Sequence, residues 1–232
     1  MLCRAASLWL NTAMQLLVLL LTAHLAFHPT DQVPQTRRQP AEPMDARGAG
    51  WLVRPEREEE EKPEQTLDAL KILPGEVVAD VGAGVGYFSL RLARRVGEKG
   101  KVFAVDIQQA MLDKLRENRD RERLDNIELV LGTETDPKLT PNSLDLALLV
   151  DVYHEFSHPA EMMEGIRAAL KPAGRLVLVE YRGEDPAVPI KPLHKMTERQ
   201  VLEEIVPMGF RHLETLSFLP RQHIIVFAKQ LH

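Results

Sequence analysis

The sequence predicts an α/β fold in which helices cover both faces of a mostly parallel sheet, as three patterns indicate. Short apolar runs alternate with amphipathic helical stretches from about residue 67 onward. The run 144–150 is nearly all apolar, which is typical of a strand buried on both faces. The chain closes on two strand-like runs, 211–218 and 223–229, with only a turn near Pro220 between them. We therefore expect a doubly wound sheet with an antiparallel C-terminal edge.

Each predicted element has its own local signal. Pro74-Gly75 ends a short helix over 66–72 and leads into the first strand, 77–80. The segment 132–143 has no helical period, so we expect a loop there. The remaining elements are expected, in chain order, as helix 87–96, strand 102–105, helix 109–123, strand 127–131, strand 144–150, helix 159–170, strand 175–180 and helix 197–206.

The second half of the chain carries three further signals. Met162 and Met163 sit at core spacing in their helix, so we expect them in the core rather than at a site. Lys-Pro-Ala-Gly at 171–174 is expected to end the preceding helix and to separate it from the fifth strand. Thr197 to Gln200 forms a capping box that opens the last helix.

Composition limits the classes of protein. The chain has 232 residues, with 44% hydrophobic and 27% charged, which suits one globular domain plus extra segments. The net charge is −5 and the basic residues are scattered, which argues against a nucleic-acid partner bound by a basic face. Cys3 is the single cysteine, so neither an intrachain disulfide nor a cysteine zinc site can form.

The N-terminal region has a different composition from the rest. Residues 1–27 look like a signal peptide or membrane anchor, because 5–27 carry no Asp, Glu, Lys or Arg. Candidate cleavage sites place His24 or Leu21 where a small residue is preferred, which favours an uncleaved anchor or slow cleavage. We expect a membrane-anchored or exported protein; a misassigned start codon ahead of a cytoplasmic enzyme stays open as the alternative. Residues 28–50 are expected to be a flexible linker, and 51–232 the main domain.

The start of the main domain allows two interpretations. Trp51 is followed by an acidic run, 56–61, which Arg57 interrupts. The run is either a solvated helix start or part of a lid that closes over a bound ligand with Trp51 packed on it.

A glycine-rich turn follows the first predicted strand. Asp80, Gly82, Gly84 and Gly86 form the pattern D-x-G-x-G-x-G ahead of a helix. Glycine permits positive φ and close approach of a ligand, and the free N–H groups of the helix start favour a polar or anionic group. The G-x-G-x-x-G pattern of dinucleotide-binding proteins does not fit, because Tyr87 stands where the last glycine belongs.

Together with Asp106, which ends the second strand, this turn resembles that of the class I, seven-stranded, S-adenosylmethionine-dependent methyltransferases. The resemblance covers about 67–230 and includes the stretch 170–176 before the fifth strand. It implies strand order 3-2-1-4-5-7-6 and S-adenosylmethionine as cosubstrate. An NAD(P)-dependent oxidoreductase and a non-catalytic cofactor-binding protein are the alternatives.

The predicted cofactor site lies at the carboxyl ends of the strands, where ligands bind in open α/β sheets. Asp106 follows Gly86 by twenty residues, which suits a carboxylate that binds a ribose diol. Family patterns often place an acid directly after the glycine of the third-strand turn, whereas Thr133 stands there and Glu134 comes next. The cofactor-binding residues implied by the resemblance are Asp80, Gly82, Ala83, Gly84, Gly86, Asp106, Ile107, Gln108, Thr133, Glu134 and Asp151.

The segment after the fourth strand contains H-E-x-x-H, from His154 to His158, which is the motif of zinc peptidases. That motif needs a helix to bring both histidines to one face, and Pro159 disfavours the α region at His158. A third ligand is not evident, although Glu180 or Glu161 could be argued. We expect no metal site here.

Methyl transfer is an in-line displacement with a neutral leaving group, so the protein mainly aligns the reactants. A base is needed only for a protonated acceptor. His154 is the first candidate, followed by Glu180 with Tyr181 and by Tyr153; a structural role for His154 is the alternative. We expect a small-molecule acceptor, whose identity the sequence does not indicate.

Overall fold

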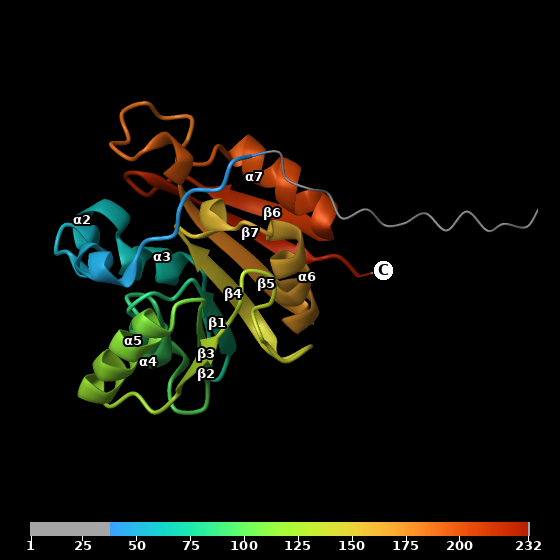
Figure 1. Cartoon of the computed structure of the whole chain (residues 1–232). Coiled ribbons are helices and arrows are strands. Elements are labelled where there is room, and N and C mark those ends of the chain that lie inside the picture. Colours follow the sequence, from blue (N-terminus) through green and yellow to red (C-terminus); the bar gives the residue numbers. More distant parts are fainter. Residues whose placement is uncertain (1–37, 232) are drawn as a thin grey trace, which may run out of the picture. The chain divides into compact units, whose positions relative to one another are not determined.

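The computed structural model describes residues 38–231, which form a seven-stranded sheet in the order β3-β2-β1-β4-β5-β7-β6 (Figure 1). The predicted strand order and the antiparallel C-terminal edge are confirmed, since β7 pairs antiparallel with β5 and β6 and the other pairs are parallel. The strands are β1 (Val77–Val81), β2 (Lys101–Asp106), β3 (Ile127–Leu131), β4 (Leu144–Val150), β5 (Leu170–Tyr181), β6 (Phe210–Leu216) and β7 (Gln222–Lys229).

Helices cover both faces of this sheet, because alternate residues of the central strands point to opposite sides. Leu146 and Leu148 of β4 pack with α3, α4 and α5, whereas Ala147 and Leu149 pack with α6 and α7. Met162 and Met163 are buried in the second layer, as their spacing predicted. The helices are α2 (Arg57–Glu61), α3 (Pro63–Ala69), α4 (Ser89–Val96), α5 (Gln109–Glu122), α6 (Pro159–Ala169) and α7 (Glu198–Ile205), with 3₁₀ segments η1 (Ala46–Val53), η2 (Tyr153–Glu155), η3 (Pro192–His194) and η4 (Val206–Met208).

Most predicted elements appear with small shifts at their ends, and β5 is the main exception. The expected stop at 171–174 lies inside β5, which begins at Leu170 because Leu170 pairs with Leu144 before the ladder shifts register. The predicted capping box is present: the Thr197 side chain accepts from Gln200 N, and the Gln200 side chain accepts from Thr197 N.

The predicted anchor or signal peptide, residues 1–27, lies outside the described residues. Among residues 38–231, every helix is too short or too polar to cross a bilayer. The predicted linker, 28–50, is described only from residue 38, and there it packs on the domain: Ala41 and Ala49 are buried. We call residues 38–54 the strap.

Candidate functional site

A cavity of about 690 Å³ opens at the carboxyl ends of β1, β2, β4 and β5. Its walls come from segments far apart in the sequence: the strap, α2, the glycine turn, the loop after β4 and the segment 189–194 before and within η3. Of the predicted cofactor-binding residues, those that line it are Asp80, Gly82, Ala83, Gly84, Asp106, Ile107, Gln108, Glu134 and Asp151. Gly86 and Thr133 are not part of its lining.

The glycine turn has the left-handed backbone that its glycines predicted, with φ of +77° at Gly82, +53° at Gly84 and +90° at Gly86. A Cβ atom on Gly82 would lie 2.3 Å from Cγ2 of Val152, and one on Gly86 would lie 2.8 Å from Cγ of Leu115. Gly86 therefore allows close helix packing, whereas Gly82 and Gly84 bring backbone to the cavity wall.

Two acids fix this turn. Asp106 accepts hydrogen bonds from the Gly84 amide at 2.9 Å and the Gln108 amide at 2.8 Å. Burial raises the pKa of Asp106 in spite of these bonds. Asp80 accepts from the Ser89 hydroxyl at 2.5 Å; burial, with a smaller effect from Asp106, raises the pKa of Asp80 to about 6. Each acid thus fixes the turn and also reaches the cavity wall.

The predicted cofactor-binding residues that follow β2 and β3 differ in their surroundings. Ile107 is partly exposed at the cavity wall. The side-chain amide of Gln108 donates through Nε2 to the Met44 carbonyl of the strap at 2.8 Å. Thr133 closes a local turn by accepting from Asp136 N. Glu134 lies at the cavity and accepts from the Ser157 hydroxyl at 3.0 Å. Of the two candidates at this turn, the structure therefore brings Glu134 to the cavity and not Thr133.

The strap closes one side of the cavity and is attached to the loop after β4. Arg38 donates to the carbonyls of His154 and Tyr153, both at 2.6 Å, and forms an ion pair with Glu204 at 3.2 Å. The Ala41 amide also donates to the His154 carbonyl, at 3.0 Å. Trp51 lines the cavity, although 52% of it stays exposed, with Arg54 stacked over its ring. Trp51 thus lies at the cavity, and the strap around it is bound to the loop after β4 by these contacts.

Sequence reasoning missed a buried charged cluster from α2. Arg57 and Glu61 are buried, form an ion pair at 2.7 Å and line the cavity. The Tyr181 hydroxyl donates to Glu61 at 3.1 Å. The only sequence feature that pointed to this cluster was Arg57, which interrupts the acidic run. However, an i, i+4 ion pair such as Arg57–Glu61 is also typical of solvated helices. The interpretation of this run as a solvated helix start fails for these two residues.

Asp151 completes this cluster from the end of β4. It has a positive φ of +49°, and one of its carboxylate oxygens accepts from the Gln222 amide at 2.7 Å. Burial and the negative charges of Glu61 and Glu180 raise the pKa of Asp151 well above its usual range. Within residues 38–231, the second oxygen of Asp151 and one oxygen of Glu61 are buried without a hydrogen-bond partner.

His154 and Glu180, two of the predicted catalytic residues, form a buried pair. His154 Nδ1 lies 2.6 Å from Glu180 Oε2, while Glu180 Oε1 accepts from the Tyr153 amide at 2.9 Å. Burial favours the neutral imidazole, but the Glu180 carboxylate outweighs it and raises the pKa of His154. His154 lines the cavity, and Glu180 lies behind it, fully buried.

Tyr153, the third predicted catalytic residue, is not part of the cavity lining. Its hydroxyl donates to Glu204 at 2.9 Å, and the Arg38 guanidinium lies over its ring. The arrangement fits a role in holding the strap and the loop after β4 in place.

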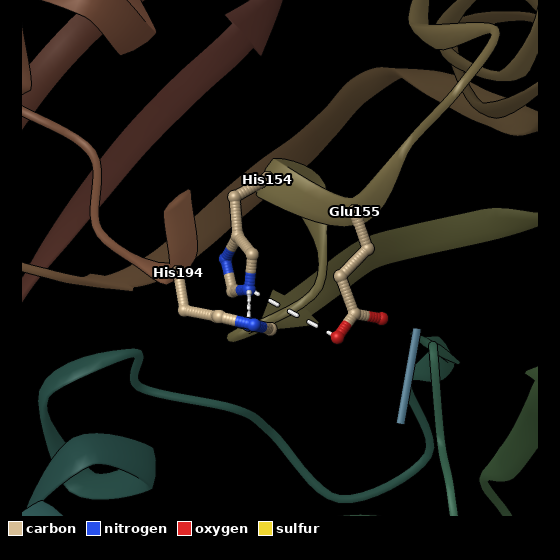
Figure 2. A group of neighbouring side chains, drawn as sticks. All are labelled: His154, Glu155 and His194. Carbon is tan, nitrogen blue, oxygen red and sulfur yellow. Dashed lines mark hydrogen bonds and ion pairs between the residues drawn. The ribbon is translucent and has the colours of Figure 1, made fainter. Parts of the chain in front are cut away.

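The two histidines of the H-E-x-x-H motif do not meet. His158 caps α6 at the surface and lies against Ser157 and Glu134, whereas His154 faces inward. The neighbour of His154 is instead His194 of η3, whose Nδ1 lies 3.2 Å from His154 Nε2 (Figure 2). Glu155 reaches the same place.

Residues 72–212 match the family model described as a methyltransferase domain. An uncharacterized protein of the Streptomyces fradiae transposon TN4556 is 32% identical over 145 residues, 62% of this chain and 41% of that protein. The ubiquinone/menaquinone biosynthesis C-methyltransferase UbiE of Vibrio cholerae is 27% identical over 146 residues, 62% of this chain and 54% of UbiE. The chain thus spans about half the length of the curated relatives it matches.

Among solved structures, a SAM-dependent methyltransferase from Aquifex aeolicus superimposes with a TM-score of 0.76 at 26% identity, covering 81% of this chain and all of that one. The family match spans more than half of the chain, and the sheet has the strand order that the glycine turn and Asp106 implied. The chain therefore belongs to the class I S-adenosylmethionine-dependent methyltransferases, a family of enzymes whose cosubstrate is S-adenosylmethionine.

Proposed function

We propose that this protein transfers a methyl group from S-adenosylmethionine to a small-molecule acceptor bound in the same cavity. The observation that carries the proposal is the convergence of the glycine turn, Asp106 and the Asp151–Glu61 cluster on one cavity. When bound, S-adenosylmethionine supplies a methyl group on a positively charged sulfonium.

The residues at the cavity fit such a cationic ligand. Asp106 would accept from the ribose hydroxyls, because each of its oxygens keeps a lone pair beyond its bond to backbone. Asp151 and Glu61 each have a buried carboxylate oxygen without a partner in the described chain, and a ligand ammonium would satisfy both. Acidic side chains in the lining outnumber the basic ones, Arg54, Arg57 and Lys191, and so favour a negative potential in the cavity.

We assign activation of the acceptor to His154, positioned by Glu180. The 2.6 Å contact between His154 Nδ1 and the Glu180 carboxylate keeps the Nδ1 proton in place, so the lone pair lies on Nε2, 3.2 Å from His194 Nδ1, and can accept a proton from the acceptor. Phe156, Pro189 and Ile190 line the cavity as well and favour an acceptor with an apolar body. The similarity to UbiE, a ubiquinone/menaquinone biosynthesis C-methyltransferase, supports an acceptor of this kind.

Calorimetric titration with S-adenosylhomocysteine and with NAD tests the cofactor assignment. We expect the protein to bind S-adenosylhomocysteine in preference to NAD, and Gly84→Val to abolish that binding. Valine would have to adopt a φ of +53°, and its Cβ would lie 2.9 Å from Cδ1 of Leu52. Preference for NAD, or unchanged affinity in the variant, would reject the assignment. Turnover with a panel of apolar acceptors then separates an enzyme from a cofactor-binding protein.

We also propose that residues 5–27 associate the chain with a membrane, as an uncleaved or slowly cleaved segment. A chain without residues 1–30 should be soluble and bind S-adenosylhomocysteine as the full chain does. Mass spectrometry of the natural protein decides the processing, because a mature chain that begins near Phe27 would show a cleaved signal peptide.

A further inference from the structure

Three side chains at the cavity gather potential metal-ligand atoms in one place (Figure 2). They are the imidazoles of His154 and His194 and the carboxylate of Glu155, which come from η2 and η3. His154 Nε2 lies 3.2 Å from His194 Nδ1 and 4.0 Å from Glu155 Oε1, and all three ligand atoms lie within 4.8 Å of one another.

These distances are close to those of a tetrahedral metal site. Ligand atoms about 2.0–2.1 Å from a zinc ion are roughly 3.3–3.4 Å apart in a tetrahedron. The two imidazole nitrogens are already at this spacing. Glu155 Oε1, at 4.0 Å from His154 Nε2, has to move by less than the length of one bond to reach this spacing from His154.

The surroundings of His154 supply a second, independent indication. Metal-binding histidines usually donate their other N–H to a carboxylate, which fixes the tautomer and orients the ring. His154 has this arrangement, with Nδ1 at 2.6 Å from Glu180 Oε2. Glu180 is fully buried and is itself fixed by the Tyr153 amide. The lone pair of His154 Nε2 is therefore directed toward His194 and Glu155.

We infer that His154, Glu155 and His194 form a binding site for a divalent transition metal of the zinc type. Three protein ligands leave one position open toward the cavity, as in catalytic rather than structural zinc sites. In the metal-bound protein His154 Nε2 is a ligand and no longer the proton acceptor proposed above, and an oxygen or nitrogen donor of the acceptor fills the open position. This part of the inference rests on the proposed methyl transfer, whereas metal binding does not. This inference departs from our expectation from sequence that the segment binds no metal.

This site is different from that of a zinc peptidase. In the peptidase motif the ligands would be His154 and His158, with Glu155 as the base. Here His158 lies at the surface, Glu155 is a ligand, and the second histidine comes from a segment forty residues away in the sequence. Spacing along the chain could not have indicated His194.

Titration of the full chain with Zn²⁺ and Co²⁺ after chelator treatment tests the site. We expect one metal ion per chain and the visible absorption of tetrahedral Co²⁺. His194→Ala should weaken binding more than about 100-fold, and Glu180→Gln about 10–100-fold, the range for loss of a partner behind a ligand. His158→Ala is the matched control and should bind metal as the wild type does. Thermal melting of each variant checks the fold; His194 is only partly buried and makes one side-chain hydrogen bond.

Failure of the wild type to bind either metal stoichiometrically would overturn the inference. So would unchanged affinity in a folded His194→Ala variant, or loss of binding in His158→Ala. A parallel titration of the metal-free protein with S-adenosylhomocysteine separates the two proposals. Binding of that ligand without metal binding would reject the metal site alone, and metal binding without it would reject the cofactor assignment alone.

Discussion

Replacing Asp80 by asparagine should stabilise the ligand-free protein at neutral pH and have a much smaller effect in acid. Asp80 is 3% exposed, and its pKa is raised to about 6 from an ordinary value of 3.8, first by burial and then by the charge of Asp106. Ser89 and Arg57 oppose this shift without cancelling it. The folded state therefore binds a proton more tightly than the unfolded state does.

The sign of the effect follows from linkage. Because the folded pKa is the higher one, ionisation of Asp80 destabilises the fold, with a penalty that grows between pH 4 and 6 and is complete above that. A difference of about two pKa units corresponds to about 3 kcal/mol at pH 8 and about 0.5 kcal/mol at pH 4. The asparagine side chain of the variant keeps an acceptor for the Ser89 hydroxyl and does not ionise. The advantage of the variant over the wild type should thus grow by about 2–3 kcal/mol from pH 4 to pH 8.

Urea unfolding of both proteins at pH 4, 5, 6 and 8 measures this difference. Asp113→Asn is the control, because Asp113 is exposed and hydrogen bonds with Gln109 and Arg116 lower its pKa. That variant should show no gain that grows with pH. A stability difference between Asp80→Asn and wild type that stays flat from pH 4 to pH 8 would refute the reasoning.

Three further predictions concern the turn, its neighbouring acid and the strap. Gly82→Ala should lower the free energy of unfolding by about 1–3 kcal/mol, because alanine would be strained at a positive φ and its Cβ would clash with Val152. Gly50→Ala, whose Cβ would meet open space, should not, and equal urea midpoints for the two variants would contradict this. Asp106→Ala should weaken S-adenosylhomocysteine and adenosine alike, by about 1.5–3 kcal/mol in calorimetry, and a loss for the first alone would show that Asp106 does not hold the ribose. Arg38→Ala should release the strap and speed its cleavage by protease, whereas Arg47→Ala, which alters only an exposed pair with Asp45, should not; identical digestion of both would argue against the attachment.

Most of the fold could be predicted from the sequence because the features that indicate its elements are local. The apolar run of β4, the glycines of the turn and the Thr197 capping box each act within a few residues, and the strand order followed from the family that they resemble. The extent of β5 was not readable, because Pro172 and Gly174 have turn chemistry, whereas pairing of Leu170 with Leu144 depends on a distant strand.

The site, too, could be predicted from sequence only in part. Asp80, Asp106 and Asp151 could be placed because each ends a strand, and the ends of parallel strands share one edge. Arg57, Glu61 and His194 could not, because each reaches the cavity through a segment outside the sheet. Tyr153 shows the reverse: it lies close after the end of β4, in η2, yet its hydroxyl donates to Glu204.

The attachment of the strap has a kinetic consequence. Arg38 donates to the carbonyls of Tyr153 and His154, and Ala41 donates to that of His154. The Tyr153 amide and the His154 side chain in turn contact Glu180. We expect ligand exchange to require lifting of the strap, which would break bonds to this loop and loosen His154 in the same motion. Departure of the spent ligand and loss of the His154–Glu180 arrangement would then be one event.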